Sequence, residues 1–157
     1  MEMNLRIAAM IILTSALLGC PVGQRPFEIA QLCLGDQKNL TQFANILKSV
    51  AQTEGMTFTD TSASTERDLK AMGVKVDPTA PVISFYVGRK DGVGLGAGNQ
   101  GLPNYQVAVG FSEGSNPSDA HRFADLVVSR LEKHWHVVFV PNPAESGALP
   151  LKNCNQQ

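Results

Sequence analysis

A possible nucleophile lies in the second half of the chain, in the segment Gly110-Phe111-Ser112-Glu113-Gly114. Its spacing is G-x-S-x-G, the pattern that places a reactive Ser on a sharp turn between a strand and a helix. In this hypothesis Ser112 attacks an ester or amide carbonyl, and Asp125 orients a general base. The base is His134 or His136. The pattern therefore makes a serine hydrolase one hypothesis for this chain.

The surroundings of Ser112 argue against hydrolysis. Four residues separate Ser112 from Pro117, where the next helix is expected to begin, so Ser112 is not on the turn itself. The chain also lacks the series of parallel βαβ units that such a site requires. A Ser-, Gly- and Asn-containing loop before a helix cap explains the same residues. We therefore predict a protein that is not an enzyme and has no cofactor.

Glycine recurs at every second position from Gly92 to Gly98, beside Arg89 and Lys90. A phosphate-binding loop would open a helix, whereas this segment leads to Leu102-Pro103 and a strand. Residues 88–104 are therefore expected to form a flexible hairpin arm or a closely packed glycine edge. Because exposed loops often carry recognition, contact with a macromolecule is the function we expect of such an arm. The candidate contact residues are Arg89, Val93, Leu95 and Leu102.

His134 and His136 flank Trp135 near the end of a predicted helix. Two His residues at i and i+2 of a strand share a face, but no third ligand has a fitting spacing, so no metal site is predicted. A His at a helix end more often contacts the helix dipole. Trp135 is expected in the core or over the end of the sheet, and it is a further candidate contact residue. The alternative is a small-ligand or metal-binding module that combines these three residues with residues 88–104.

Periodicity predicts the elements that position these residues. Helical spacing predicts helices over 26–35, 36–55, 61–73 and 116–131. Alternation predicts strands over 56–60, 82–87, 105–111 and 136–140. Asp36 and Asn116 are typical N-caps, and Pro117 suits a first helical position. Together they indicate an α+β two-layer sandwich, ferredoxin-like in outline, with a mainly antiparallel sheet of about four strands packed against two principal helices.

An uncharged run of twelve residues, from Ile7 to Leu18, lies near the N-terminus. It is too short to span a membrane and is typical of a signal peptide. The run ends in Leu17-Leu18-Gly19-Cys20. Here the chain resembles bacterial lipoproteins, whose lipobox is Leu, a variable position, a small residue and the lipidated Cys. The resemblance implies cleavage before Cys20 and acylation of that residue, and two or more acyl chains anchor a protein stably.

The same resemblance implies a signal peptide (1–19) and a lipidated tether (20–25). The remaining length suits one globular α+β domain (26–157), with a loose C-terminal tail. Pro21 stands where Asp favours retention in the inner membrane, so the resemblance points to the periplasmic face of the outer membrane. The formal net charge is only −1, which gives no reason to expect nucleic acid as a partner.

Three cysteines leave one pair once Cys20 is acylated. Because the compartment beyond the inner membrane is oxidising, Cys33 and Cys154 are expected to form a disulfide. The sequence thus predicts an outer-membrane-anchored lipoprotein that acts through contact with a periplasmic or envelope protein. It would be an envelope accessory, or an inhibitor or immunity-type protein.

Overall fold

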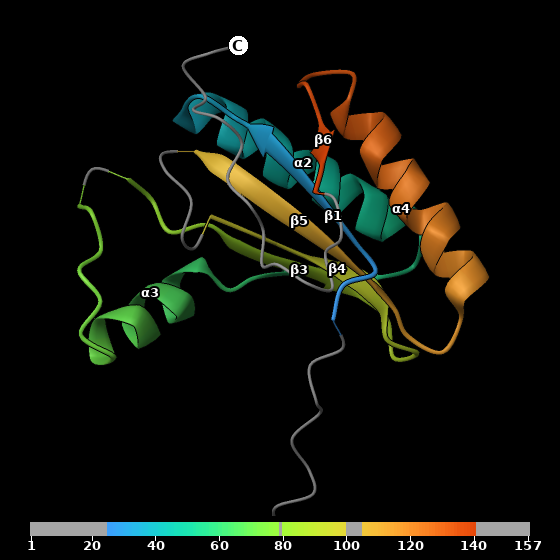
Figure 1. Ribbon diagram of the computed structural model, residues 1–157, viewed down its shortest axis with the longest axis horizontal. Helices are drawn as coiled ribbons and strands as arrows, with labels where there is room; N and C mark the ends of the chain where they lie inside the picture. The colour runs from blue at the N-terminus through green and yellow to red at the C-terminus, as the bar shows by residue number, and fades with distance from the viewer. Residues whose placement is uncertain (1–24, 79, 100–104, 141–157) are drawn as a thin grey trace, which may run out of the picture.

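The computed structural model describes residues 25–78, 80–99 and 105–140, which form one six-stranded antiparallel sheet and three helices (Figure 1). The strands are β1 (Glu28–Cys33), β2 (Thr57–Asp60), β3 (Ser84–Gly88), β4 (Val93–Gly98), β5 (Gln106–Glu113) and β6 (Val138–Phe139). The helices are α2 (Gln37–Thr53), α3 (Ser62–Ala71) and α4 (Pro117–Leu131). The sheet order is β2-β3-β4-β5-β1-β6, and each neighbouring pair is antiparallel. The predicted α+β sandwich is confirmed, but the sheet has six strands where about four were expected.

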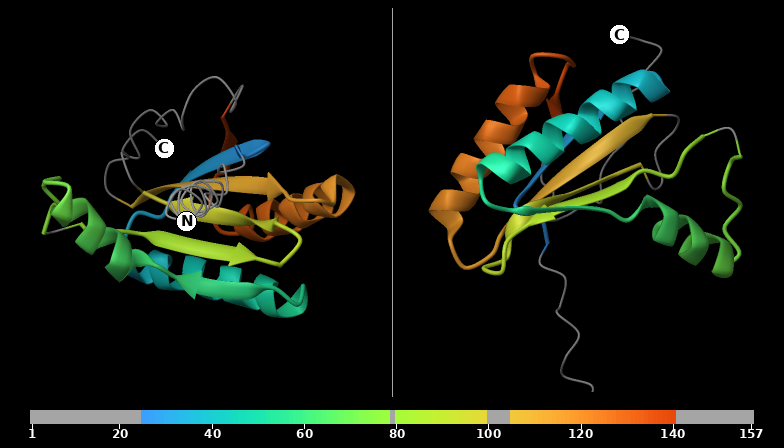
Figure 2. Two further views of the ribbon diagram at one scale, coloured as in Figure 1. Left: turned by 90° about the horizontal axis from the view of Figure 1, so that it is seen from below. Right: turned by 180° about the vertical axis from the view of Figure 1, so that it is seen from behind.

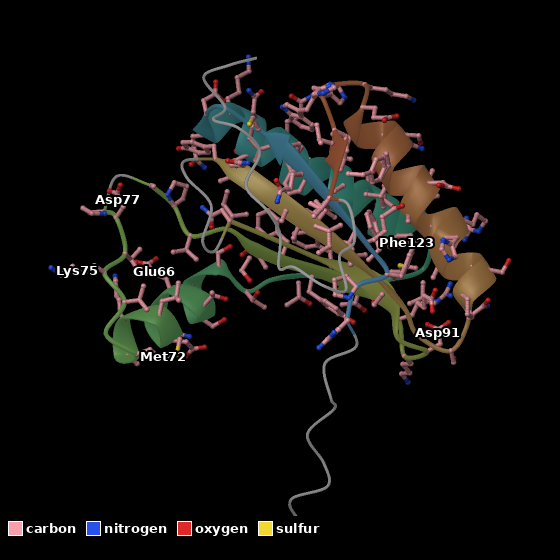
Figure 3. The ribbon with its side chains drawn as sticks, in the orientation of Figure 1. Glu66, Met72, Lys75, Asp77, Asp91 and Phe123 are labelled. Carbon is pink, nitrogen blue, oxygen red and sulfur yellow. The ribbon has the colours of Figure 1, made fainter. Side chains whose placement is uncertain are left out.

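The two longer helices make the second layer. Figure 2 shows α2 and α4 together on one face of the sheet, while α3 lies apart from them at one end. The core lies between these layers, and α3 contributes no buried residue to it. Its largest fully buried members are the aromatic and aliphatic side chains Phe43, Phe111, Phe123, Leu32, Leu34, Leu47, Ile83, Leu95 and Leu131. Figure 3 shows Phe123 between α4 and the sheet.

Side-chain caps fix where the two principal helices begin. The Asp36 carboxylate accepts a hydrogen bond from the backbone N–H of Asn39 at 2.8 Å. The Asn116 side chain accepts one from the N–H of Asp119 at 3.2 Å, and Pro117 follows at the first helical position. These bonds satisfy N–H groups that have no partner within a helix. Both predicted N-caps are confirmed.

The first predicted helix, over 26–35, is wrong, because this segment contains β1. The strand pairs with β5 and β6 within the sheet, and its central residues are buried on both faces. Ala30 and Leu32 pack beneath the helices, while Ile29 and Gln31 are buried on the opposite face. A strand buried on both sides does not alternate between apolar and exposed positions, so its apolar residues can imitate helical spacing.

The segment expected as an arm is also different in the structure, because it contains β4. This strand pairs with β3 on one side and β5 on the other. Val93, Leu95 and Ala97 enter the core, while Gly94, Gly96 and Gly98 occupy the alternate positions on the opposite face. In the part of the chain that the structure describes, no helix is long and apolar enough to cross a membrane.

Candidate functional site

A groove of about 680 Å³ lies between α2 and the end of α4. Its lining includes Lys38, Gln42 and Ile46 from α2 and Arg130, Lys133 and His134 from α4 and the turn that follows it. The apolar stripe of α2 faces the sheet, with Phe43 and Leu47 fully buried. Residues at i, i+4 and i+8 from Lys38 share another face of the same helix, and this face borders the groove.

The two sides of the groove are joined by a hydrogen bond. The Gln42 Nε2 and His134 Nδ1 atoms lie 2.9 Å apart, although the residues are far apart in sequence. The backbone N–H of His134 donates to the carbonyl of Leu131 at 2.9 Å, which holds the histidine in the turn after α4. The position of His134 is therefore set by the helix end and by a contact from the opposite helix.

The groove is basic although the whole chain is almost neutral. Lys38, Arg130 and Lys133 are exposed and line it, and its described lining contains no carboxylate. Within residues 25–78, 80–99 and 105–140, none of these three cations forms an ion pair. The nearest acidic residues along the chain are Asp36, which caps α2, and Glu132, which lines an adjoining hollow. The arrangement is suited to a negatively charged ligand.

The proposed nucleophile is not placed for catalysis. Ser112 lies within β5, opposite Gly94, and not on a turn between a strand and a helix. Its hydroxyl donates to the carbonyl of Gly92 at 2.9 Å and lies 3.3 Å from that of Gly94. His134 follows the far end of α4, a helix of roughly 22 Å by its fifteen residues. The structure therefore does not bring together the groups that a serine hydrolase would need.

Arg89, a candidate contact residue, is held in an ion network. Its guanidinium forms a bidentate pair with Asp91, at 2.8–3.1 Å, and a further short pair with Asp119. Asp119 also accepts from Arg122, which binds Glu54 at 2.5 Å. The network joins the β3–β4 turn to the start of α4 and the end of α2; Figure 3 labels Asp91 at this turn. The Arg89 guanidinium holds the pKa of both aspartates below their ordinary value.

Replacing Arg89 by Gln should lower the Tm at neutral pH, and the loss should shrink as the pH falls below about 4. Because the pKa of Asp91 and Asp119 is lower in the folded state, their ionised carboxylates stabilise that state at any pH above their ordinary pKa of about 4. This stability is lost as the pH falls through the lower pKa of the folded state. Thermal unfolding at about pH 7 and about pH 3, followed by circular dichroism, measures both effects. Lys90→Gln, at an exposed neighbour, is the control. A loss of equal size at both pH values would contradict the assignment.

The other predicted contact residues differ in their exposure. Val93 and Leu95 are 0% and 1% exposed, so they belong to the core and cannot contact a partner at the folded surface. Trp135 is half-buried, with its ring edge-on to Phe43 at a centroid distance of 6.1 Å. Leu102 lies outside the described residues.

The histidines and cysteines were the remaining predicted site residues. His134, Trp135 and His136 line a hollow of about 470 Å³ beside the groove. The described ranges contain no group of three or more His, Cys, Asp or Glu that could hold a metal ion. Cys33, at the end of β1, is disulfide-bonded. Cys20 and Cys154 lie outside the described residues, so the identity of its partner stays a prediction.

The sequence did not lead us to predict the groove, although the spacing of some of its lining residues is visible there. Lys38, Gln42 and Ser49 recur at helical spacing on the polar side of the predicted helix over 36–55. That pattern describes any solvated helix face until the neighbouring helix is known.

Neither a protein-family model nor a curated protein sequence matches the chain.

Proposed function

We propose that the protein is a lipoprotein anchored to the outer membrane through Cys20, and that it acts by binding another protein of the cell envelope. It has no catalytic role in this proposal. The anchor is supported by the lipobox Leu17-Leu18-Gly19-Cys20 and the uncharged run before it. We also propose that the fold is a ferredoxin-like arrangement widened by two strands, with the β2–β5 meander between α2 and α4.

The observation that carries the binding role is the position of the groove relative to the start of the domain. Phe27, two residues after the first described residue, packs against His121 near the start of α4, with the rings tilted and their centroids 4.3 Å apart. Arg130 and Lys133 lie at and beyond the other end of this helix. The nine residue steps from His121 to Arg130 span about 14 Å along the helix axis. A domain tethered at its N-terminus would thus present the groove away from the anchor.

Cys20→Ser is expected to abolish lipid attachment completely. In cells fed radiolabelled palmitate, the wild-type chain should carry label and fractionate with the outer membrane, because the thiol of Cys20 takes the diacylglycerol. Cys154→Ser is the matched control and should retain the label. Intact-mass analysis reads the same adduct directly. An unacylated wild-type chain recovered from osmotic-shock fluid would contradict the anchor.

An inhibitor and an envelope accessory differ in what they bind. Crosslinking in intact cells, followed by purification of the complex, should return one stoichiometric protein. An inhibitor or immunity-type protein is expected to abolish the activity of that protein in a purified assay, and an accessory is expected to leave it active. If a small ligand co-purifies and no protein does, the binding role proposed here is wrong.

A further inference from the structure

The basic charge of the α2–α4 groove is not balanced within the described chain. At the opposite end of α4, Arg89 and Arg122 are paired with carboxylates, and on α3 Lys70 is paired with Glu66 at 2.6 Å. Lys38, Arg130 and Lys133 border the groove without such pairs among the described residues. Cations that converge on a concave surface favour an anionic ligand there.

The floor of the groove adds an apolar requirement. Ile46 is half-buried between the polar residues of α2, and the aliphatic stems of Lys38 and Lys133 extend the apolar surface beside it. The Gln42–His134 hydrogen bond crosses the groove, so the Gln42 Nε2 and His134 Nδ1 atoms already have a partner in each other. A ligand that fills the groove must therefore present apolar atoms to its floor and carboxylates to its rim. Inorganic anions meet only the second requirement.

The length of the groove suits a polypeptide segment. Its lining on α2 runs from Lys38 to Ser49, which is roughly 16 Å along the helix axis. Roughly five extended residues, or three turns of helix, cover that distance. The cations at and after the end of α4 lie on the far side from the N-terminal entry to the domain, marked by the Phe27–His121 contact. This orientation favours a protein partner over the headgroups of the anchoring bilayer.

We propose that the α2–α4 groove binds an acidic, amphipathic segment of the partner protein. Lys38, Arg130 and Lys133 pair with its carboxylates, and Ile46 contacts its apolar side chains. The proposal rests on the protein-binding function proposed above and names the chemistry of the partner. Because the three cations are exposed, each pair contributes little by itself, and the three together orient the segment, speed its association and raise its affinity. Binding should therefore weaken as the salt concentration rises.

The first experiment measures binding to the full-length acylated protein in detergent. The probe is a synthetic peptide of about twelve residues, long enough to span the groove as a helix. Its Leu residues are spaced to lie on one face of that helix and its Glu residues on the other. The groove variant Lys38→Glu/Arg130→Glu/Lys133→Glu is compared with Arg67→Glu/Lys75→Glu/Lys90→Glu, which changes the net charge equally at exposed sites elsewhere. Circular dichroism confirms that both variants are folded.

The acidic peptide should bind the wild type and the control variant equally, and the groove variant at least about tenfold more weakly. A peptide with Gln in place of every Glu should bind the wild type more weakly than the acidic peptide does, by a similar factor. Equal binding by both variants, or equal binding of the Gln peptide, would overturn the proposal. So would binding of phosphatidylglycerol vesicles in preference to the peptide, with that binding lost in the groove variant, because the site would then recognise a membrane.

A second experiment separates this proposal from the protein-binding function itself. A photocrosslinking residue is placed in cells at Ser49, in the groove, or at Arg67, on α3. Crosslinking from Ser49 to an acidic segment of a stoichiometric partner, lost in the groove variant, is the expected result. A partner captured only from Arg67, and unaffected by the groove variant, would overturn the groove while the binding function stands. Failure of both positions to capture a protein would contradict the binding function.

Discussion

Gly94→Ala is expected to lower the free energy of unfolding by about 3 kcal/mol, near the upper end of the usual cost of overpacking. Gly94 is buried in β4, a central strand of the sheet. A Cβ atom at this position would lie 2.3 Å from the carbonyl oxygen of Val87 and 2.9 Å from the Cα atom of Gly88. Both contacts are with the backbone of β3, so no side-chain rotation relieves them. The two strands must move apart to accept the methyl group.

Gly96→Ala is the matched control, two residues along the same strand and on the same face. A Cβ atom there meets no atom within 4 Å. Alanine also restricts the unfolded chain more than glycine does, so stability should be unchanged or raised by up to about 1 kcal/mol. Urea denaturation of Gly94→Ala, Gly96→Ala and the wild type measures the difference. Equal losses in the two variants would contradict the close approach of β3 and β4 at Gly94.

Cys154→Ser is expected to lower the free energy of unfolding by about 3 kcal/mol, because it removes the predicted bridge to Cys33. A Cys33–Cys154 disulfide closes a loop of about 120 residues, and a cross-link over so long a loop strongly restricts the unfolded chain. It also ties the C-terminal segment to the end of β1, a strand that is paired on both sides. Chemical denaturation with and without reductant should show that reduction of the wild type costs as much as the substitution.

Peptide mapping without reductant identifies the partner of Cys33. The expected product joins the Cys33 and Cys154 peptides, while Cys20 carries lipid. Cys20→Ser should leave this product intact and is the control for the mapping. A peptide that joins Cys20 to Cys33 would contradict both the predicted pairing and the lipid anchor, since one sulfur atom cannot serve both.

Sequence alone predicts the elements whose signals are local. Asp36 and Asn116 mark the starts of α2 and α4 because an N-cap acts on N–H groups only two or three residues away. The strands β2, β3 and β5 are recognisable because one face is apolar and the other is not. The hydrolase pattern around Ser112 is also local, but whether Ser112 lies on a turn depends on its pairing with Gly94, which is set by the whole sheet.

The misassigned segments depend on distant partners. In β1, α2 and α4 cover the face that carries Ala30 and Leu32, and Ile29 and Gln31 are buried on the opposite face as well, which no local pattern of the strand announces. In β4, the alternation of Val93, Leu95 and Ala97 with glycine is a period-two pattern, and it was available in the sequence. Glycine normally weakens a strand, so its high frequency favoured a loop. Gly94 explains part of this composition, because β3 leaves no room for a side chain there.

The candidate site depends even more on tertiary arrangement. Lys38 and Lys133 are ordinary exposed lysines in the sequence, and their proximity to one groove follows from the packing of α2 beside the end of α4. For Arg89, the tertiary arrangement removes a candidate contact residue that the sequence had suggested. It is a plausible contact residue beside a glycine-rich segment, yet Asp119, far along the chain, occupies its guanidinium.

The contact between Phe27 and His121 limits how far the basic groove can lie from the membrane in which Cys20 would be anchored. If acylated Cys20 is held at the bilayer, the seven residue steps from Cys20 to Phe27 extend at most roughly 25 Å, and about 14 Å of α4 separates His121 from Arg130. The basic end of the helical layer then stays within about 40 Å of the lipid surface. Under the anchor proposed above, a binding partner must come within that distance of the membrane, which favours proteins that are themselves embedded in the outer membrane or docked on it.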